Sequence, residues 1–144
     1  MTVNVTAVND VPTAAANTKT AVEDTALLLA AADFGFADVD TGAALSQIQI
    51  TALPTAGSLW VDADSSGTIN NAEAALIAND TVSLANIAKL TYLGALNSNG
   101  NGYGNFSFKV HDGTAYSASA YLMTVNVTAV NDVPTASPNP TLAR

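Results

Sequence analysis

The chain has 144 residues, 49% of them apolar, with 12 Asp and Glu against 4 Lys and Arg and a net charge of −8. An acidic surface of this kind repels nucleic acid and anionic membranes, so we expect neither as a partner. The chain has no cysteine, which excludes disulfides and thiolate metal sites. No apolar run approaches the roughly 20 residues that span a bilayer, so we expect no membrane insertion.

The beginning of the chain recurs near its end. Residues 1–14 and 123–136 both read MTVNVTAVNDVPTA, an offset of 122 residues (123 − 1). Repeats of domain size are typical of arrays in which similar modules follow one another. We therefore predict that residues 1–10 are the last strand and linker of a preceding repeat, that 11–134 form one complete repeat, and that 135–144 begin the next linker or a tail. Neighbouring repeats of the same chain are the expected partners.

Alternating apolar and polar residues predict a series of short strands. In chain order they lie within 1–8, 20–29 (two strands around the turn Glu23-Asp24), 47–53, 58–61, 87–93, 105–110 and 121–127. One short helix is expected over 72–78, which reads AEAALIA. About seven such strands predict an all-β Greek-key β-sandwich. The strand at 2–8 lacks a sheet of its own, which predicts weak self-association through that segment.

An acidic loop follows the strand at 58–61. Residues 62–73 fit the twelve-residue calcium loop of an EF-hand position by position, with Gly67 at the sharp bend. Two features depart from that motif: Ser66 replaces the usual Asp or Asn, and a strand rather than a helix enters the loop. The alternative is an ordinary polar turn. The predicted Ca²⁺ ligands are Asp62, Asp64, Ser66, the Thr68 carbonyl, Asn70 and Glu73.

The strand order predicts a further acidic group at each end of the sandwich. Carboxylates gathered from separate segments repel one another unless a cation bridges them. The alternative is that each Asp caps its own turn. The upstream group comprises Asn9, Asp10, Asp38, Asp40 and Asp112, and the downstream group comprises Glu23, Asp24, Asn131 and Asp132.

Several motifs occur in a characteristic order: EDTALLL, FADVDTG, ITALPTAGSLWVD, VSLANIAKLTY, FSFKVHDG and VNVTAVNDVP. Together they resemble the cadherin-like, immunoglobulin-like repeats of giant secreted bacterial adhesins of the RTX type, over nearly all of residues 9–134. The resemblance implies a secreted, cell-surface protein whose repeats are stiffened by calcium. Carried over to this sequence, it implies calcium ligands at Asp10, Asp38, Asp40 and Asp112 upstream, and at Glu23 and Asp132 downstream.

The function we expect is that of a calcium-stabilised spacer that projects a distal adhesive domain. The alternative is a glycan-binding or homophilic adhesion module, in which Trp60 and Tyr92 would form a stacking platform rather than pack inside the domain. We expect no enzyme activity. The sole histidine, His111, has no identifiable nucleophile or second base paired with it and is expected to be a strand-end residue.

Overall fold

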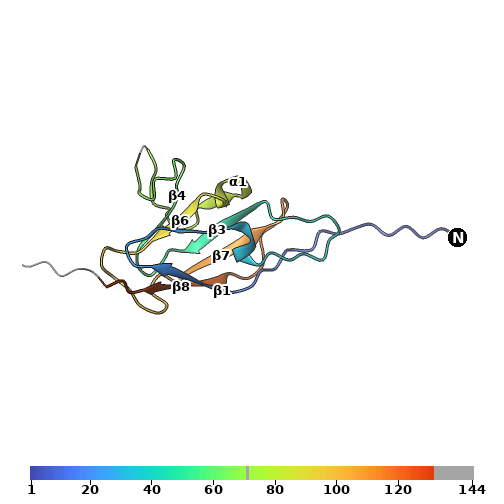
Figure 1. Ribbon diagram of the computed structural model, residues 1–144. Coiled ribbons are helices and arrows are strands. Elements are labelled where there is room, and N and C mark those ends of the chain that lie inside the picture. The colour runs from blue at the N-terminus through green and yellow to red at the C-terminus, as the bar shows by residue number, and fades with distance from the viewer. Residues whose placement is uncertain (71, 132–144) are drawn as a thin grey trace, which may run out of the picture.

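The computed structural model describes residues 1–70 and 72–131, which form two β-sheets packed over a shared core (Figure 1). The five-stranded sheet has the order β1-β8-β7-β3-β5, and the three-stranded sheet has the order β2-β6-β4. The strands are β1 (Asn17–Val22), β2 (Leu27–Leu28), β3 (Gln47–Ala52), β4 (Ser58–Val61), β5 (Thr81–Ser83), β6 (Leu90–Leu93), β7 (Phe106–His111) and β8 (Tyr121–Thr128). The predicted all-β sandwich is confirmed.

The core follows from the two-residue period of the strands. Alternate side chains of a strand point to opposite faces, so a strand with every second residue apolar buries that row against the other sheet. The rows predicted for β3 and β7 are at most 1% exposed: Ile48, Ile50, Phe106, Phe108 and Val110. A 3₁₀ turn, η1 (Ala31–Phe34), adds Phe34, whose ring meets Phe108 edge-on at 4.9 Å between centroids.

The first and last strands of the sandwich are parallel neighbours. β1 pairs with β8 from Asn17 opposite Met123 to Val22 opposite Thr128. Because the two strands run in the same direction, the chain enters the sandwich at one end and leaves it at the other (Figure 1). We call the entry end the upstream pole and the exit end the downstream pole. Units with this topology join end to end without a return connection.

The helix predicted over 72–78 is wrong. Leu76 donates its backbone N–H to the Leu59 carbonyl at 2.8 Å, and Ala72 and Asn79 have φ near +70°, which no α-helix allows. Isolated helices this short are marginal, so packing of Leu76 on the core decides the conformation. Within the part of the chain that the structure describes, the one α-helical turn is α1 (Leu84–Ile87), and the strand predicted at 87–93 begins only at Leu90. Among the described residues, no helix is long and apolar enough to cross a membrane.

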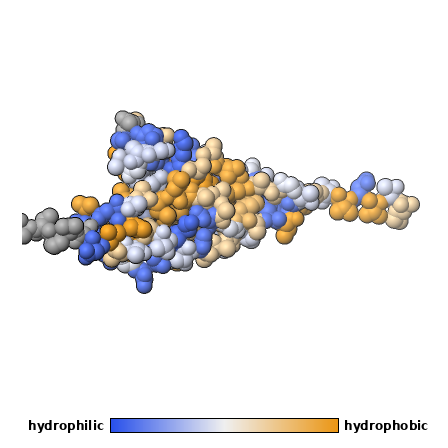
Figure 2. Space-filling view, viewed as in Figure 1, coloured by the Kyte–Doolittle hydropathy of each residue, from blue (hydrophilic) through white to orange (hydrophobic). Residues whose placement is uncertain are grey.

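Residues 1–8, which we call the N-terminal arm, extend away from the upstream pole (Figure 1). They form no strand within the chain, and Val3 and Val5 are 75% and 90% exposed. Figure 2 shows apolar residues along this arm. The predicted pairing of residues 2–8 with another molecule stays a prediction. The predicted ranges 11–134 and 135–144 extend beyond residue 131, outside the described residues.

Candidate functional site

The loop at 62–73 is organised by one buried carboxylate. Asp62 directly follows β4, is 5% exposed, and donates its N–H to the Lys89 carbonyl at 2.9 Å. Its two carboxylate oxygens accept the N–H groups of Ser66, at 3.1 Å, and Gly67, at 2.8 Å. Gly67 has φ +77°, a left-handed conformation that side chains rarely adopt. Asp62 and Gly67 therefore bend the chain back on itself, as the sequence predicts.

The remaining oxygen groups of the loop lie close to one another. The Ser66 hydroxyl lies 2.9 Å from the Thr68 carbonyl oxygen and 3.4 Å from Asn70 Oδ1. Glu73 closes the loop, because its Oε2 accepts the Ala63 N–H at 2.6 Å and its Oε1 accepts the Asn70 N–H at 3.2 Å. The structure thus brings together all six residues that the sequence predicts as ligands.

The spacing of the acids suits a single cation. Asp62, Asp64 and Glu73 each offer one carboxylate oxygen, and these oxygens all lie within 4.8 Å of one another. Two oxygens that bind the same calcium ion at 2.3–2.6 Å each are at most roughly 5 Å apart. The loop could therefore hold a metal ion. The backbone N–H groups that these carboxylates accept keep the loop in this shape.

A second acidic cluster lies at the upstream pole. Asp38, Asp40 and Asp112 also offer three carboxylate oxygens within 4.8 Å of one another and could hold a metal ion. The linker runs beside them: the Asp10 N–H donates to Asp40 Oδ2 at 2.8 Å, and Asn9 Nδ2 donates to Asp112 Oδ2 at 3.3 Å. The structure therefore brings together the upstream group that the sequence predicts, from three segments of the chain.

Two carboxylates of this cluster have distinct surroundings. Asp112 Oδ1 accepts the N–H groups of Ala115 and Thr114, both at 2.8 Å. These backbone donors, of which Ala115 has the larger effect, hold the pKa of Asp112 below its usual value, so this carboxylate stays ionised. Asp38 Oδ2 is buried and receives no hydrogen bond from the described residues. A buried acceptor without a donor is unusual in proteins, and a cation would supply the missing partner.

The predicted downstream group is arranged differently. Glu23 is 5% exposed, and its Oε2 accepts the Val130 N–H at 2.9 Å and Asn99 Nδ2 at 3.4 Å. Asp24 Oδ1 accepts the Asn97 N–H at 2.7 Å. Within residues 1–70 and 72–131, these acids form no cluster of three. Glu23 instead holds the exit of the chain through Val130, and Asp24 holds the loop before β7 through Asn97. Asn131 is exposed, and the predicted ligand Asp132 lies outside the described residues.

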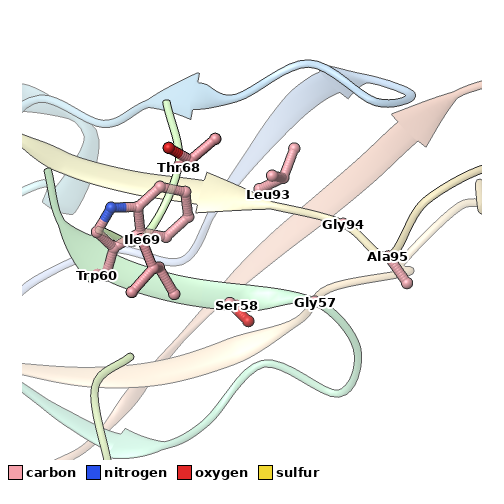
Figure 3. Close-up of a pocket in the computed structure, with 8 residues that line it drawn as sticks. All are labelled: Gly57, Ser58, Trp60, Thr68, Ile69, Leu93, Gly94 and Ala95. Atoms are coloured by element: carbon pink, nitrogen blue, oxygen red, sulfur yellow. The ribbon is translucent and has the colours of Figure 1, made fainter. Parts of the chain in front are cut away.

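The aromatic pair does not form an exposed platform. Tyr92 is fully buried and donates its hydroxyl hydrogen to the Ala56 carbonyl at 2.8 Å, and burial raises its pKa to about 12. Trp60 is 1% exposed and lines a pocket together with Ile69 of the loop (Figure 3). This pocket of about 420 Å³ is also lined by Ser58, Leu93 and small residues near Gly94. The interpretation that both rings pack inside the domain is confirmed.

His111 contacts Ser46, a partner that the sequence did not reveal. Its Nδ1 lies 3.0 Å from the Ser46 hydroxyl and also accepts the Gly113 N–H at 2.9 Å. The Ser46 N–H in turn donates to the His111 carbonyl at 2.8 Å, which continues the β3–β7 ladder. The two residues are 65 positions apart, and only the register of these strands brings them together. His111 is a strand-end residue, as expected.

No protein-family model matches the chain, and no curated protein or solved structure matches it. The resemblance to cadherin-like repeats therefore rests on the sequence motifs alone.

Proposed function

We propose that this chain is a calcium-stabilised spacer module of a secreted, tandem-repeat adhesin at the cell surface. The observation that carries the proposal is the geometry of the loop at 62–73. Six residues with oxygen ligands lie together there, and three of their carboxylate oxygens are close enough to bind a single ion. Calcium prefers six to eight oxygen ligands from such a loop, whereas magnesium demands a stricter octahedral arrangement. In this proposal the ion makes the module more rigid and has no catalytic role.

The upstream pole gives the ion a mechanical role. The linker residues Asn9 and Asp10 already contact Asp112 and Asp40, and the bridge between Thr13 and Ala37 continues this contact with two backbone hydrogen bonds of 2.8 Å. An ion among the three carboxylates would fix the linker to the sandwich. Bending between one repeat and the next would then require the loss of metal contacts.

The repeat extends this role to the other end. Asn131-Asp132 is the second copy of Asn9-Asp10 in the sequence, and β8, which precedes it, ends at the downstream pole. In an array these residues would meet the Asp38, Asp40 and Asp112 equivalents of the next unit. Partners are then the neighbouring repeats. Extracellular calcium modules bind with dissociation constants of about 10⁻⁴–10⁻³ M, which suits a protein that works outside the cell.

The aromatic platform on which the glycan-binding alternative depends is buried. Trp60 and Tyr92 are both at most 1% exposed, so neither ring is available to stack on a sugar. No other observation on the described residues favours that alternative over the spacer.

Thermal unfolding in calcium and in chelator tests the proposal. An ion that binds only the folded state stabilises it by about 2.7 kcal/mol per site at 100 times the dissociation constant. For a domain of this size we expect Tm to rise by roughly 5–10 °C per site. Magnesium at the same concentration is the control and should raise Tm much less. A Tm that is equal in calcium and in chelator would remove the proposed function.

A further inference from the structure

The N-terminal arm is a second copy of the strand that completes the larger sheet. Residues 1–8 are identical to 123–130, which contain most of β8. In β8 the side chains of Met123, Val125 and Val127 are 0–5% exposed. Their counterparts in the arm, Met1, Val3 and Val5, are 75–117% exposed. The molecule therefore presents in solution the same apolar row that it buries in its core.

The contacts that hold β8 in its sheet are made by residues that the arm also has. β8 pairs with β1 from Met123 to Thr128 on one side, and with β7 from Tyr121 to Met123 on the other. The Asn126 side chain accepts the Gly102 N–H at 2.6 Å, and Val127 exchanges two backbone hydrogen bonds with Gly100. Residues 1–6 match 123–128, so the arm supplies every residue that pairs with β1. Only Tyr121 and Leu122 have no counterpart.

The arm is not placed to fill this position in its own sandwich. Backbone contacts of Asp10 and Thr13 hold the linker at the upstream pole, and the arm points away from it (Figure 1). Pairing parallel to the β1 that follows it would require a crossover, which takes about a dozen residues or more. The linker between the arm and β1 spans only residues 9–16. A second molecule faces no such restriction.

We propose that the arm of one copy takes the place of β8 in a second copy, so that chains join head to tail. Residues 9–12 of the donor then follow the exchanged strand at the downstream pole of the acceptor, and their sequence is identical to that of residues 131–134, which follow β8 in the chain. The exchange thus rebuilds between separate chains the arrangement that the repeat creates within one chain. It requires no metal and is independent of the proposed calcium function.

Exchange replaces one set of contacts with a nearly identical set. The buried row and the β1 pairing are the same, while the pairs of Tyr121 and Leu122 with β7 are lost. Association also costs translational and rotational freedom. The chain's own β8 therefore holds the position at low protein concentration. A change that excludes the chain's own β8, but leaves the arm intact, should reverse this preference.

The variant Val125→Asp makes that change, because it places a charge at a fully buried position of β8 only. The full-length chain is refolded from denaturant at about 1 mM, near the effective concentration of a tethered segment. We expect a β-sheet circular dichroism signal together with masses at multiples of 14.6 kDa by light scattering. The ratio of dimer to monomer should fall on dilution, by about tenfold for each tenfold dilution once most chains are monomeric.

Two further variants separate exchange from nonspecific aggregation. Adding Val3→Asp to Val125→Asp removes the only competent strand, so both the oligomers and the β-sheet signal should disappear. Adding Thr6→Asp instead introduces the same charge at the counterpart of the exposed Thr128 and should leave both unchanged. Val3 is exposed in the monomer, so Val3→Asp alone should not alter its Tm. The proposal fails if Val125→Asp is monomeric at every concentration, whether folded or unfolded, or if its oligomers persist with Val3→Asp.

Discussion

The loop at 62–73 and the upstream pole gather the same chemistry by different routes. Both place three carboxylate oxygens within 4.8 Å of one another. The loop takes all its groups from twelve consecutive residues, anchored by the buried Asp62. The pole takes its carboxylates from two segments of the chain: Asp38 and Asp40 lie in one, and Asp112 lies 72 residues after Asp40 (112 − 40) in the other. The linker that contains Asp10 is a third segment beside them.

This difference predicts two structural roles: the loop stabilises the domain, and the upstream cluster attaches the linker to it. A loop built from consecutive residues stabilises itself, so damage to it should lower the stability of this one domain. A cluster built from separate segments connects them, so damage to it should loosen the linker and leave the sandwich intact. The following variants test this division, in order of decreasing expected effect.

Asp62→Ala should have the largest effect. It leaves the Gly67 N–H without its acceptor and removes one of the two acceptors of the Ser66 N–H, which also donates to Asp64 Oδ1 at 3.1 Å. The loss of the acceptor of one partly buried donor costs about 1–3 kcal/mol in chelator. Urea unfolding measures this loss. Asp64→Ala is the matched control, because Asp64 is exposed, and it should cost under about 1 kcal/mol in chelator. Equal losses for the two variants would contradict the role of Asp62 as the anchor.

Glu73→Gln should remove calcium binding at the loop while the fold persists. The neutral amide retains an oxygen for the Ala63 N–H but cannot act as a bidentate carboxylate. The loop's share of the calcium-dependent stabilisation, about 2.7 kcal/mol at 100 times the dissociation constant, should be lost. Thermal unfolding with and without calcium measures it. Asp33→Asn, which removes one charge outside both clusters, should retain the full calcium effect.

Asp40→Ala should loosen the linker without destabilising the sandwich. It removes the acceptor of the Asp10 N–H, and a hydrogen bond of about 1.5 kcal/mol corresponds to a roughly tenfold loss of hydrogen-exchange protection at that amide. Thr41→Ala, at the neighbouring exposed position, is the control. A large drop in Tm with unchanged protection at Asp10 would reverse the proposed division.

The smallest effect concerns pH at the upstream pole. The pKa of Asp112 is lower in the folded chain than its ordinary value, chiefly because of the Ala115 and Thr114 N–H groups. The stabilisation from these contacts is therefore complete above the ordinary pKa of Asp and is lost as pH falls through the lowered folded-state pKa. An NMR titration of the carboxyl carbon measures this. Asn9→Ala should raise that pKa only slightly, and a full return to the ordinary value would contradict this assignment.

The two clusters also differ in how much of them the sequence could predict. The loop could be predicted because all its ligand residues lie within twelve consecutive positions, where their spacing can be compared with a known motif, and because Gly67 identifies the bend. Most of the strands could be predicted from their two-residue period, whereas β5, with only three residues, is too short to show that period and was missed. The helix at 72–78 was mispredicted because Leu76 pairs with Leu59, a contact outside the segment. The contact between Ser46 and His111 was missed because it depends on strand register.

The downstream group shows the limit of topological reasoning. Strand direction correctly placed Glu23 and Asp24 near the chain exit, but it could not show that Glu23 accepts the Val130 N–H. Whether a carboxylate faces an ion or a backbone donor depends on local hydrogen bonding, which the spacing of residues does not encode.

A calorimetric titration of the full chain with calcium tests the central claim most directly. The account predicts two binding events per chain, one lost in Glu73→Gln and the other lost in Asp40→Ala. No heat of binding up to millimolar calcium, or the same titration for wild type and Glu73→Gln, would contradict it.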